Sequence, residues 1–220
     1  MIKKGKNDVS KGFIYIVLFI AWSFAIQIID VEAIGPMGTE VGFATINGWF
    51  HEMTGVHMWI YHVTDWLGLV PIFICMVFGW IGFIQLIKRR NICKVDYDII
   101  ILGLYYVIVI AGYLIFEMFP INYRPILIEG ILEESYPSST TLLVLCVMPT
   151  LVYQCNQRLQ NDRMKRTIAI MTGIFSFLMV IGRLIAGVHW LTDIIGSALL
   201  SMGLFHIYKG SVGHLKNKED

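Results

Sequence analysis

The sequence predicts an all-α polytopic membrane protein, folded as a bundle of six transmembrane helices. Of its 220 residues, 56% are hydrophobic and only 15% are charged, whereas soluble domains carry about 25% charged residues. The hydrophobic residues also gather into long segments, and a spanning helix needs roughly 20 mostly apolar residues. Because the few basic residues form no stripe, the expected partner is the bilayer rather than a nucleic acid.

Six hydrophobic segments are the expected spans, and they lie at residues 12–29, 59–87, 99–118, 140–153, 167–186 and 190–208. The first lacks a small-residue cleavage site and continues into Gln27 and Asp30, so we expect an uncleaved span rather than a signal peptide. The second is long enough to tilt or to include an interfacial turn at Pro71. The fourth is short for a full span and could begin within the protein.

The basic residues orient the predicted bundle. Fifteen of the seventeen lie before the first span, after the last, or in the second-to-third and fourth-to-fifth connections, which share one side. The positive-inside rule makes that side cytoplasmic, so both termini are expected there. The chain then divides into a cytoplasmic segment at 1–11, a membrane domain at 12–208 and a cytoplasmic tail at 209–220. The fifteen residues are Lys3, Lys4, Lys6, Lys11, Lys88, Arg89, Arg90, Lys94, Arg158, Arg163, Lys165, Arg166, Lys209, Lys216 and Lys218.

Arg124 and Arg183 are the two basic residues on the predicted outer side, in the third-to-fourth and fifth-to-sixth connections. An arginine beside the membrane core is costly unless it has a partner or a purpose. Its planar, permanently charged guanidinium suits phosphate oxygens. We therefore expect both arginines to bind an anion rather than to set the topology.

His189 and Asp193 follow Arg183 closely and extend this predicted anion site. In a helix the two residues would lie one turn apart on the same face. The carboxylate could then hold one imidazole nitrogen and leave the other free to attack or to relay a proton. This spacing favours phosphate chemistry at the outer edge of the membrane.

Pro137 and the four small hydroxyl residues after it are typical of a helix start. Ser138 or Ser139 could cap that helix, and its free backbone amides would face outward. A helix N-terminus binds anions through such amides and the helix dipole. We expect this segment to contribute to the same anion site.

These residues give the chain a resemblance to the type 2 phosphatidic acid phosphatase family, whose signature has the parts KxxxxxxRP, PSGH and SRxxxxxHxxxD. The third part is present as Gly182-Arg183, five residues, His189, three residues and Asp193, with only the leading serine changed. The order, the spacing and the six spans agree with the family over about residues 60–208. The resemblance implies a phosphatase-like core in that range.

The first two parts of the signature are incomplete. In the first, Arg124-Pro125 is present, but Glu117 stands at the lysine position. In the second, Pro137 and Ser138 are present, while Ser139 replaces glycine and Thr140 replaces histidine. The lysine-to-glutamate change moves the local charge two units toward the negative in a pocket meant for a dianion.

The resemblance implies a mechanism for this site. His189 would attack phosphorus and form a phosphohistidine, with Asp193 orienting it. Arg124, Arg183 and the amides around Ser138 and Ser139 would neutralise the equatorial oxygens in the transition state. The family's histidine in the second part protonates the leaving alkoxide. Thr140 cannot act as an acid near neutral pH, although it can still donate a hydrogen bond.

Three interpretations of the departures stay open. Glu117 or another acidic group could replace the missing acid. Alternatively, Glu117 could pair with Arg124, or contact a substrate hydroxyl or amine. In the third interpretation the site has lost hydrolysis and merely binds a lipid headgroup. Asp65, near the start of the second span, is interpreted as an interfacial cap or a polar contact within the bundle.

The expected function is hydrolysis of a lipid phosphate or diphosphate at the outer face of a bacterial plasma membrane. A headgroup phosphotransferase and a catalytically impaired phospholipid-binding protein are the alternatives. No cofactor and no metal are expected, since His57 and His62 are five residues apart, a poor ligand spacing on a helix. The sequence does not indicate the oligomeric state.

Overall fold

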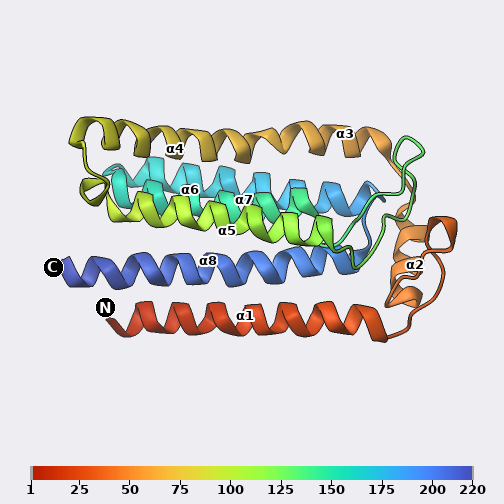
Figure 1. Cartoon of the computed structure of the whole chain (residues 1–220). Coiled ribbons are helices and arrows are strands. Elements are labelled where there is room, and N and C mark those ends of the chain that lie inside the picture. The colour runs from red at the N-terminus through yellow and green to blue at the C-terminus, as the bar shows by residue number, and fades with distance from the viewer. Residues whose placement is uncertain (1, 220) are drawn as a thin grey trace.

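Long helices lie side by side along one axis, and a short helix with several loops covers one end of the bundle (Figure 1). The structure, a computed structural model, describes residues 2–219, with side chains described for residues 5–215. Over this range β-structure is limited to isolated bridges, so the predicted all-α class is confirmed. The helices are α1 (Ile2–Ile28), α2 (Ala44–Thr54), α3 (Met58–Leu67), α4 (Leu69–Arg89), α5 (Tyr97–Met118), α6 (Ser139–Arg158), α7 (Asp162–Ile185) and α8 (Leu191–Glu219), with short 3-10 turns η1 (Pro36–Gly38) and η2 (Ile92–Lys94).

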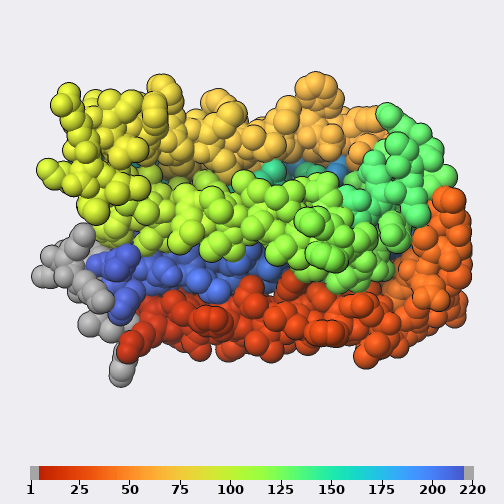
Figure 2. All heavy atoms as spheres, in the orientation of Figure 1, coloured from red at the N-terminus to blue at the C-terminus, as the bar shows by residue number. Residues whose placement is uncertain are grey.

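Six segments are long and apolar enough to cross a bilayer, and each overlaps one predicted span. Large apolar side chains cover their outer surfaces: Phe24, Phe73 and Phe177 are between 62% and 64% exposed. Figure 2 shows this elongated surface, along which α5 and α1 lie lengthwise as far as the loops of one end. Such a surface requires lipid rather than water around it. The segments are Gly5–Ile28, Met58–Arg89, Tyr97–Met118, Ser139–Arg158, Asp162–Ile185 and Leu191–Leu215.

Both chain ends lie at the same end of the bundle, called here the inner end (Figure 1). Helix α1 begins at Ile2 and α8 continues to Glu219, so the described residues of the two predicted tails, 2–11 and 209–219, extend the first and last helices. The side chains of four basic residues counted for orientation, Lys3, Lys4, Lys216 and Lys218, lie outside those described. Assignment of the inner end to the cytoplasm stays a prediction.

The sequence suggested an interfacial turn at Pro71 in the second span. In the structure the span breaks three residues earlier, at Gly68. Gly68 is a one-residue turn between α3 and α4, and its amide donates to the carbonyls of both Thr64 and Asp65, each at 3.0 Å. Pro71 has no N–H group to bond the carbonyl of Leu67, four residues earlier. The helix therefore loosens one turn before the proline, and Asp65 lies just above this break.

The fourth span is longer than the predicted range 140–153, because its last turns carry polar residues that pack inside the bundle. Gln154 is fully buried, and its side chain donates to the hydroxyl of Tyr208 at 2.7 Å. Tyr106 and Thr150 form a second buried polar pair, with their hydroxyl oxygens 2.8 Å apart. A hydropathy pattern underestimates such a helix, since its polar groups meet protein rather than lipid.

Helix α2, which was not predicted, fixes the start of α8 at the other end of the bundle, called here the outer end. The Asn47 side chain donates to the Thr192 hydroxyl at 3.0 Å and accepts from the Thr192 amide at 3.3 Å. Trp22 of α1 donates to the Thr192 carbonyl at 3.1 Å. Three elements therefore meet at the first turn of α8, where Asp193 lies.

Tyr136 anchors the connection that leads into α6. Its ring stacks on Phe19 at 6.0 Å between centroids and meets the edge of Phe116 at 5.8 Å. Its hydroxyl lies 2.8 Å from the hydroxyl of Ser23. Helix α8 passes this ring at Gly196, where an added Cβ would lie 2.4 Å from Tyr136 Cε2. The absence of a side chain at Gly196 thus lets the connection seat against α1 and α8.

Gly196→Ala is expected to lower the free energy of unfolding by about 1–3 kcal/mol, because the new methyl group overpacks the Tyr136 site. Thermal unfolding of the purified protein measures the effect. Gly103→Ala is the matched control, since a Cβ there meets no heavy atom within 4 Å. Equal melting temperatures for the two variants would contradict this account of the packing.

Candidate active site

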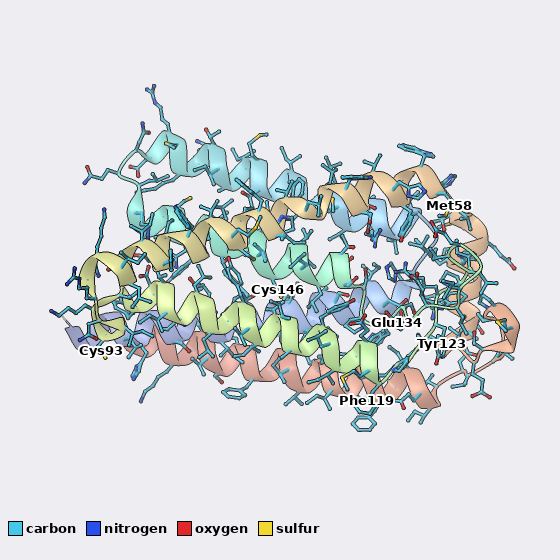
Figure 3. The ribbon with its side chains drawn as sticks, turned by 45° about the horizontal axis from the view of Figure 1, so that its top comes forward. Met58, Cys93, Phe119, Tyr123, Glu134 and Cys146 are labelled. Atoms are coloured by element: carbon cyan, nitrogen blue, oxygen red, sulfur yellow. The ribbon has the colours of Figure 1, made fainter. Side chains whose placement is uncertain are left out.

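The connection between α5 and α6 folds back on itself at the outer end. Tyr123 and Glu134 form an antiparallel bridge, and Figure 3 labels both near that end. The Arg124 amide donates to the Glu133 carbonyl at 3.0 Å, and the Ser135 amide donates to the Asn122 carbonyl at 2.9 Å. This pairing brings Arg124 and Ser135, eleven positions apart in the sequence, to neighbouring places.

His189 lies in the turn between α7 and α8, within the predicted connection between the fifth and sixth spans, so it does not share a helix with Asp193. Gly187 makes this turn with a left-handed φ of +70°, and a Cβ there would lie 2.1 Å from the Gly55 carbonyl oxygen. The Ala186 carbonyl also accepts from the His57 amide at 3.0 Å. The chain must therefore leave the helix before His189, and glycine is the residue that permits this conformation.

The His189 ring is held at one nitrogen and free at the other. Nδ1 lies 3.1 Å from the Ser135 carbonyl oxygen and 3.7 Å from Asp193 Oδ2. A carbonyl can only accept, so Nδ1 carries the proton and Nε2 keeps its lone pair. Nε2 is buried and has no hydrogen-bond partner among the described residues. The closest orienting contact is thus a backbone carbonyl, with the predicted carboxylate partner slightly farther away.

Asp193 lies in the first turn of α8 and is fully buried. Its Oδ2 accepts from the Trp190 amide at 2.9 Å, and its Oδ1 accepts from the Asn122 side chain at 3.4 Å. The carboxylate therefore satisfies a free amide at the helix start while facing the imidazole. Its predicted place beside His189 agrees with this geometry.

Burial and two nearby positive charges favour the neutral form of His189. Burial lowers the pKa of His189 well below its ordinary value, and the charges of Arg124 and Arg183 lower it further. A neutral imidazole with a free lone pair is the nucleophilic form of histidine. The arginines that would bind a phosphate therefore also prepare the residue that would attack it.

The two arginines both lie over one aromatic ring, that of Tyr61. The guanidinium carbons of Arg183 and Arg124 lie 4.9 Å and 5.8 Å from the centre of the Tyr61 ring. Arg183 is 1% exposed and also lies 3.4 Å from the Thr64 hydroxyl and 3.8 Å from Asp65 Oδ1. Arg124 Nε lies 3.0 Å from Glu133 Oε2. Two positive charges are therefore gathered close to His189, and their effects on it add.

A polar cavity of about 320 Å³ opens in front of this group. Arg124 and His189 line it, and Arg124 Nη1 finds no hydrogen-bond partner within the described part of the chain. Glu117 lines the same cavity, but the carboxylate that Arg124 pairs with is that of Glu133. The pairing of Glu117 with Arg124 that the sequence allowed is thus not the one formed.

The first turn of α6 lies beside this cavity. Ser138 occupies the N-cap position, but its side chain makes no capping bond and donates instead to the Thr141 hydroxyl at 3.1 Å. The amides of the first helical turn therefore keep their capacity to bind an anion. Ser139 lines the polar cavity. Of the two predicted caps, Ser138 and Ser139, Ser138 takes the N-cap position but its hydroxyl bonds within the bundle.

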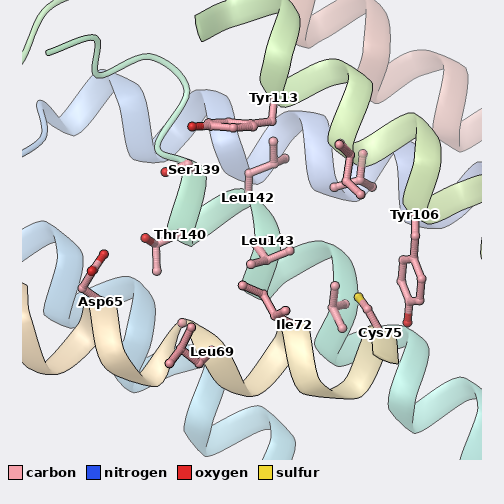
Figure 4. A pocket seen from close by; sticks show the side chains of 14 residues that line it. Asp65, Leu69, Ile72, Cys75, Tyr106, Tyr113, Ser139, Thr140, Leu142 and Leu143 are labelled. Carbon is pink, nitrogen blue, oxygen red and sulfur yellow. The ribbon is translucent and has the colours of Figure 1, made fainter. Parts of the chain in front are cut away.

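A second, apolar cavity of about 510 Å³ runs from this point into the membrane region between α4, α5 and α6 (Figure 4). Leu69, Ile72 and Leu143 are among the apolar side chains that line it. Tyr113 and Ser139 line both cavities, so the two spaces adjoin. Thr140 faces the apolar cavity rather than the polar one.

Sequence reasoning missed four contributors to the site. The Ser135 carbonyl has no residue-type signal, because any residue could supply it. Asn122 and Tyr61 lie far along the chain from their partners Asp193 and Arg183, and Glu133 meets Arg124 only because their connection folds back on itself. The weak signals were the Asn-Tyr-Arg run of the outer connection and the carboxylates beside it.

A family model described as the PAP2 superfamily matches residues 69–214. The chain belongs to the PAP2 superfamily. This membership confirms the resemblance to the type 2 phosphatidic acid phosphatases. The matched range contains the residues from Arg124 to Asp193 that form the outer-end site.

One curated relative and one solved structure, both from Bacillus subtilis, resemble this PAP2 protein. Phosphatidylglycerophosphatase B (strain 168) is 32% identical over 90 residues, 40% of this chain and 43% of the relative, so the alignment spans less than half of that relative. The crystal structure of the first transmembrane PAP2 type phosphatidylglycerolphosphate phosphatase has a TM-score of 0.67 at 18% identity, covering 96% of this chain and 98% of that chain. At that identity the structural likeness establishes a shared transmembrane fold.

Proposed function

We propose that the protein is a membrane-bound phosphatase that hydrolyses a lipid phosphate or diphosphate through a phosphohistidine at His189. The observation that carries the proposal is the buried, unpartnered Nε2 of His189, which shares a polar cavity with Arg124. Membership of the PAP2 superfamily and the similarity to a phosphatidylglycerophosphatase support a lipid phosphate as the substrate class. The adjoining apolar cavity offers space for the lipid tail.

In the proposed reaction the imidazole displaces the lipid alcohol from phosphorus, and water then displaces the imidazole. Arg124, Arg183 and the free amides of the α6 start stabilise the negative charge on the equatorial oxygens. The Ser135 carbonyl fixes the tautomer of His189, and Asp193 stabilises the positive charge that the ring acquires. Every part of the nucleophilic half of the reaction therefore has a candidate residue.

The proposed side of action is the extracytoplasmic face. Nine of the basic residues used for orientation, from Lys88 to Lys209, lie at the inner ends of α4, α6, α7 and α8 or in the connection from α4 to α5. Arg124 and Arg183, by contrast, lie at the outer-end site. The positive-inside rule supports a cytoplasmic inner end, which would place the cavity at the outer leaflet.

The test is an assay of the purified protein in sealed vesicles with phosphatidylglycerophosphate, phosphatidate and a prenyl diphosphate. We expect release of inorganic phosphate from at least one of them. Cys93 is exposed at the inner end, so labelling with an impermeant maleimide shows which vesicles carry the cavity outward. Transfer of phosphate to an added alcohol, in place of release, would identify a phosphotransferase. Tight binding without turnover would leave only a headgroup-binding protein.

A further inference from the structure

The leaving-group side of the site has a position without an acid. In the family signature a histidine stands where this chain has Thr140, and a threonine hydroxyl cannot protonate an alkoxide near neutral pH. A poor alcohol leaving group requires a proton as its bond to phosphorus breaks. The group that supplies this proton has to lie where the leaving oxygen lies.

The two adjoining cavities locate that oxygen. Phosphate binds in the polar cavity with Arg124 and His189, and a lipid tail belongs in the apolar cavity between α4, α5 and α6. The alcohol oxygen joins the tail to the phosphate. It therefore lies at the junction of the two spaces, beside Ser139, which lines both.

Asp65 is the carboxylic acid at this junction. Among the described residues that line the apolar cavity, it alone carries a carboxyl group, whereas Glu117, Glu133 and Glu134 line the polar cavity. Figure 4 shows the Asp65 and Thr140 side chains facing each other at the polar end of the apolar cavity. An added Cβ at Gly68, one turn from Asp65, would lie 3.5 Å from Thr140 Cγ2, so α3 and α4 pack directly against the start of α6.

Asp65 is also connected to the phosphate site. Its Oδ1 lies 3.8 Å from Arg183 Nη2, and its side chain is 60% exposed. The carboxyl group can thus reach both the charged cluster and the junction.

We propose, on the basis of the proposed phosphatase function, that Asp65 is the catalytic acid that replaces the family's histidine at the Thr140 position. In the first step His189 Nε2 forms a bond to phosphorus, the bond from phosphorus to the alcohol oxygen breaks, and that oxygen takes the proton of Asp65. In the second step water attacks the phosphohistidine and gives a proton to the Asp65 carboxylate. The nitrogen–phosphorus bond then breaks, hydrogen phosphate leaves, and the neutral histidine is restored.

The experiment compares two substrates for Asp65→Asn: an alkyl phosphate and a nitrophenyl phosphate. Nitrophenolate leaves without a proton, so it bypasses the acid. First-turnover release of the alkyl alcohol should fall by about 10²- to 10⁴-fold, and that of nitrophenol by less than about tenfold. Because the second step loses its base, nitrophenol should appear as a burst equal to the amount of enzyme. Glu52→Gln, at an exposed carboxylate outside the cavities, should match the wild type with both substrates.

Three results would overturn the assignment of Asp65. If Asp65→Asn slows the release of the alkyl alcohol and of nitrophenol equally, Asp65 only positions Arg183. If it slows neither release, Asp65 has no part in the reaction. A loss confined to the alkyl substrate in Glu117→Gln instead would move the acid to Glu117. If the wild-type protein releases neither alcohol nor phosphate, the proposed function itself fails, which distinguishes the two proposals.

Discussion

His189→Gln is expected to abolish phosphate release, with a fall in kcat of about 10⁴-fold or more, the size seen when a nucleophile is removed from an enzyme. Glutamine can keep a hydrogen bond to the Ser135 carbonyl, which His189 Nδ1 approaches at 3.1 Å. It has no lone-pair nitrogen to attack phosphorus. The fold should therefore survive while the reaction stops. The measurement is release of phosphate and of alcohol from the same lipid phosphate, together with labelling of the protein by radioactive phosphate.

The chain offers a matched control for this substitution. His206 Nδ1 lies 3.5 Å from Asp8 Oδ1, almost the distance of 3.7 Å between His189 and Asp193, but this second pair lies toward the inner end, between α1 and α8. His206→Gln should retain activity and the acid-labile phosphate label. Activity that persists in His189→Gln, or a label that persists without His189, would assign the nucleophile elsewhere.

The sequence predicted those residues whose chemistry is out of place in a membrane segment. Arg124 and Arg183 stand out because every other basic residue lies on the predicted inner side, and His189 and Asp193 stand out by their spacing from Arg183. The spans could be predicted for a related reason, since each must be continuous and apolar. In both cases the signal lies in residue type and local position.

The parts that could not be predicted depend on contacts between distant segments. Asp65 was interpreted as an interfacial cap or a polar contact within the bundle, and only the packing of α3 against α7 identifies Arg183, at 3.8 Å, as its contact. The turn that carries His189 follows from the approach of Gly187 to the Gly55 backbone. Helix α2 is held by the contacts of Asn47 with Thr192, which no local pattern reveals. Tertiary packing decides such features, not periodicity.

The second large effect concerns Arg183, whose guanidinium is 1% exposed and is one of the two positive charges that act on His189. Arg183→Met should lower kcat by about 10³- to 10⁵-fold, the range for a guanidinium that stabilises a phosphoryl transition state. The kcat of Arg183→Lys should lie between those of the wild type and Arg183→Met. Lysine keeps the charge but lacks the planar donors near the Thr64 hydroxyl and Asp65. Asp65 remains 60% exposed, so water can solvate it and the variant should fold.

A pH profile separates this electrostatic role from a structural one. The positive charge of Arg183 is one cause of the lowered pKa of His189, so its removal should move that pKa upward, toward the ordinary value. Protonated imidazole cannot attack, and the acid limb of kcat/KM should therefore shift to higher pH in Arg183→Met and less in Arg183→Lys. Arg163→Met, at an exposed position of the same helix near its inner end, should leave both rate and limb unchanged. A loss of activity with an unmoved acid limb would show that Arg183 supports the packing of α3 on α7 rather than the charge at His189.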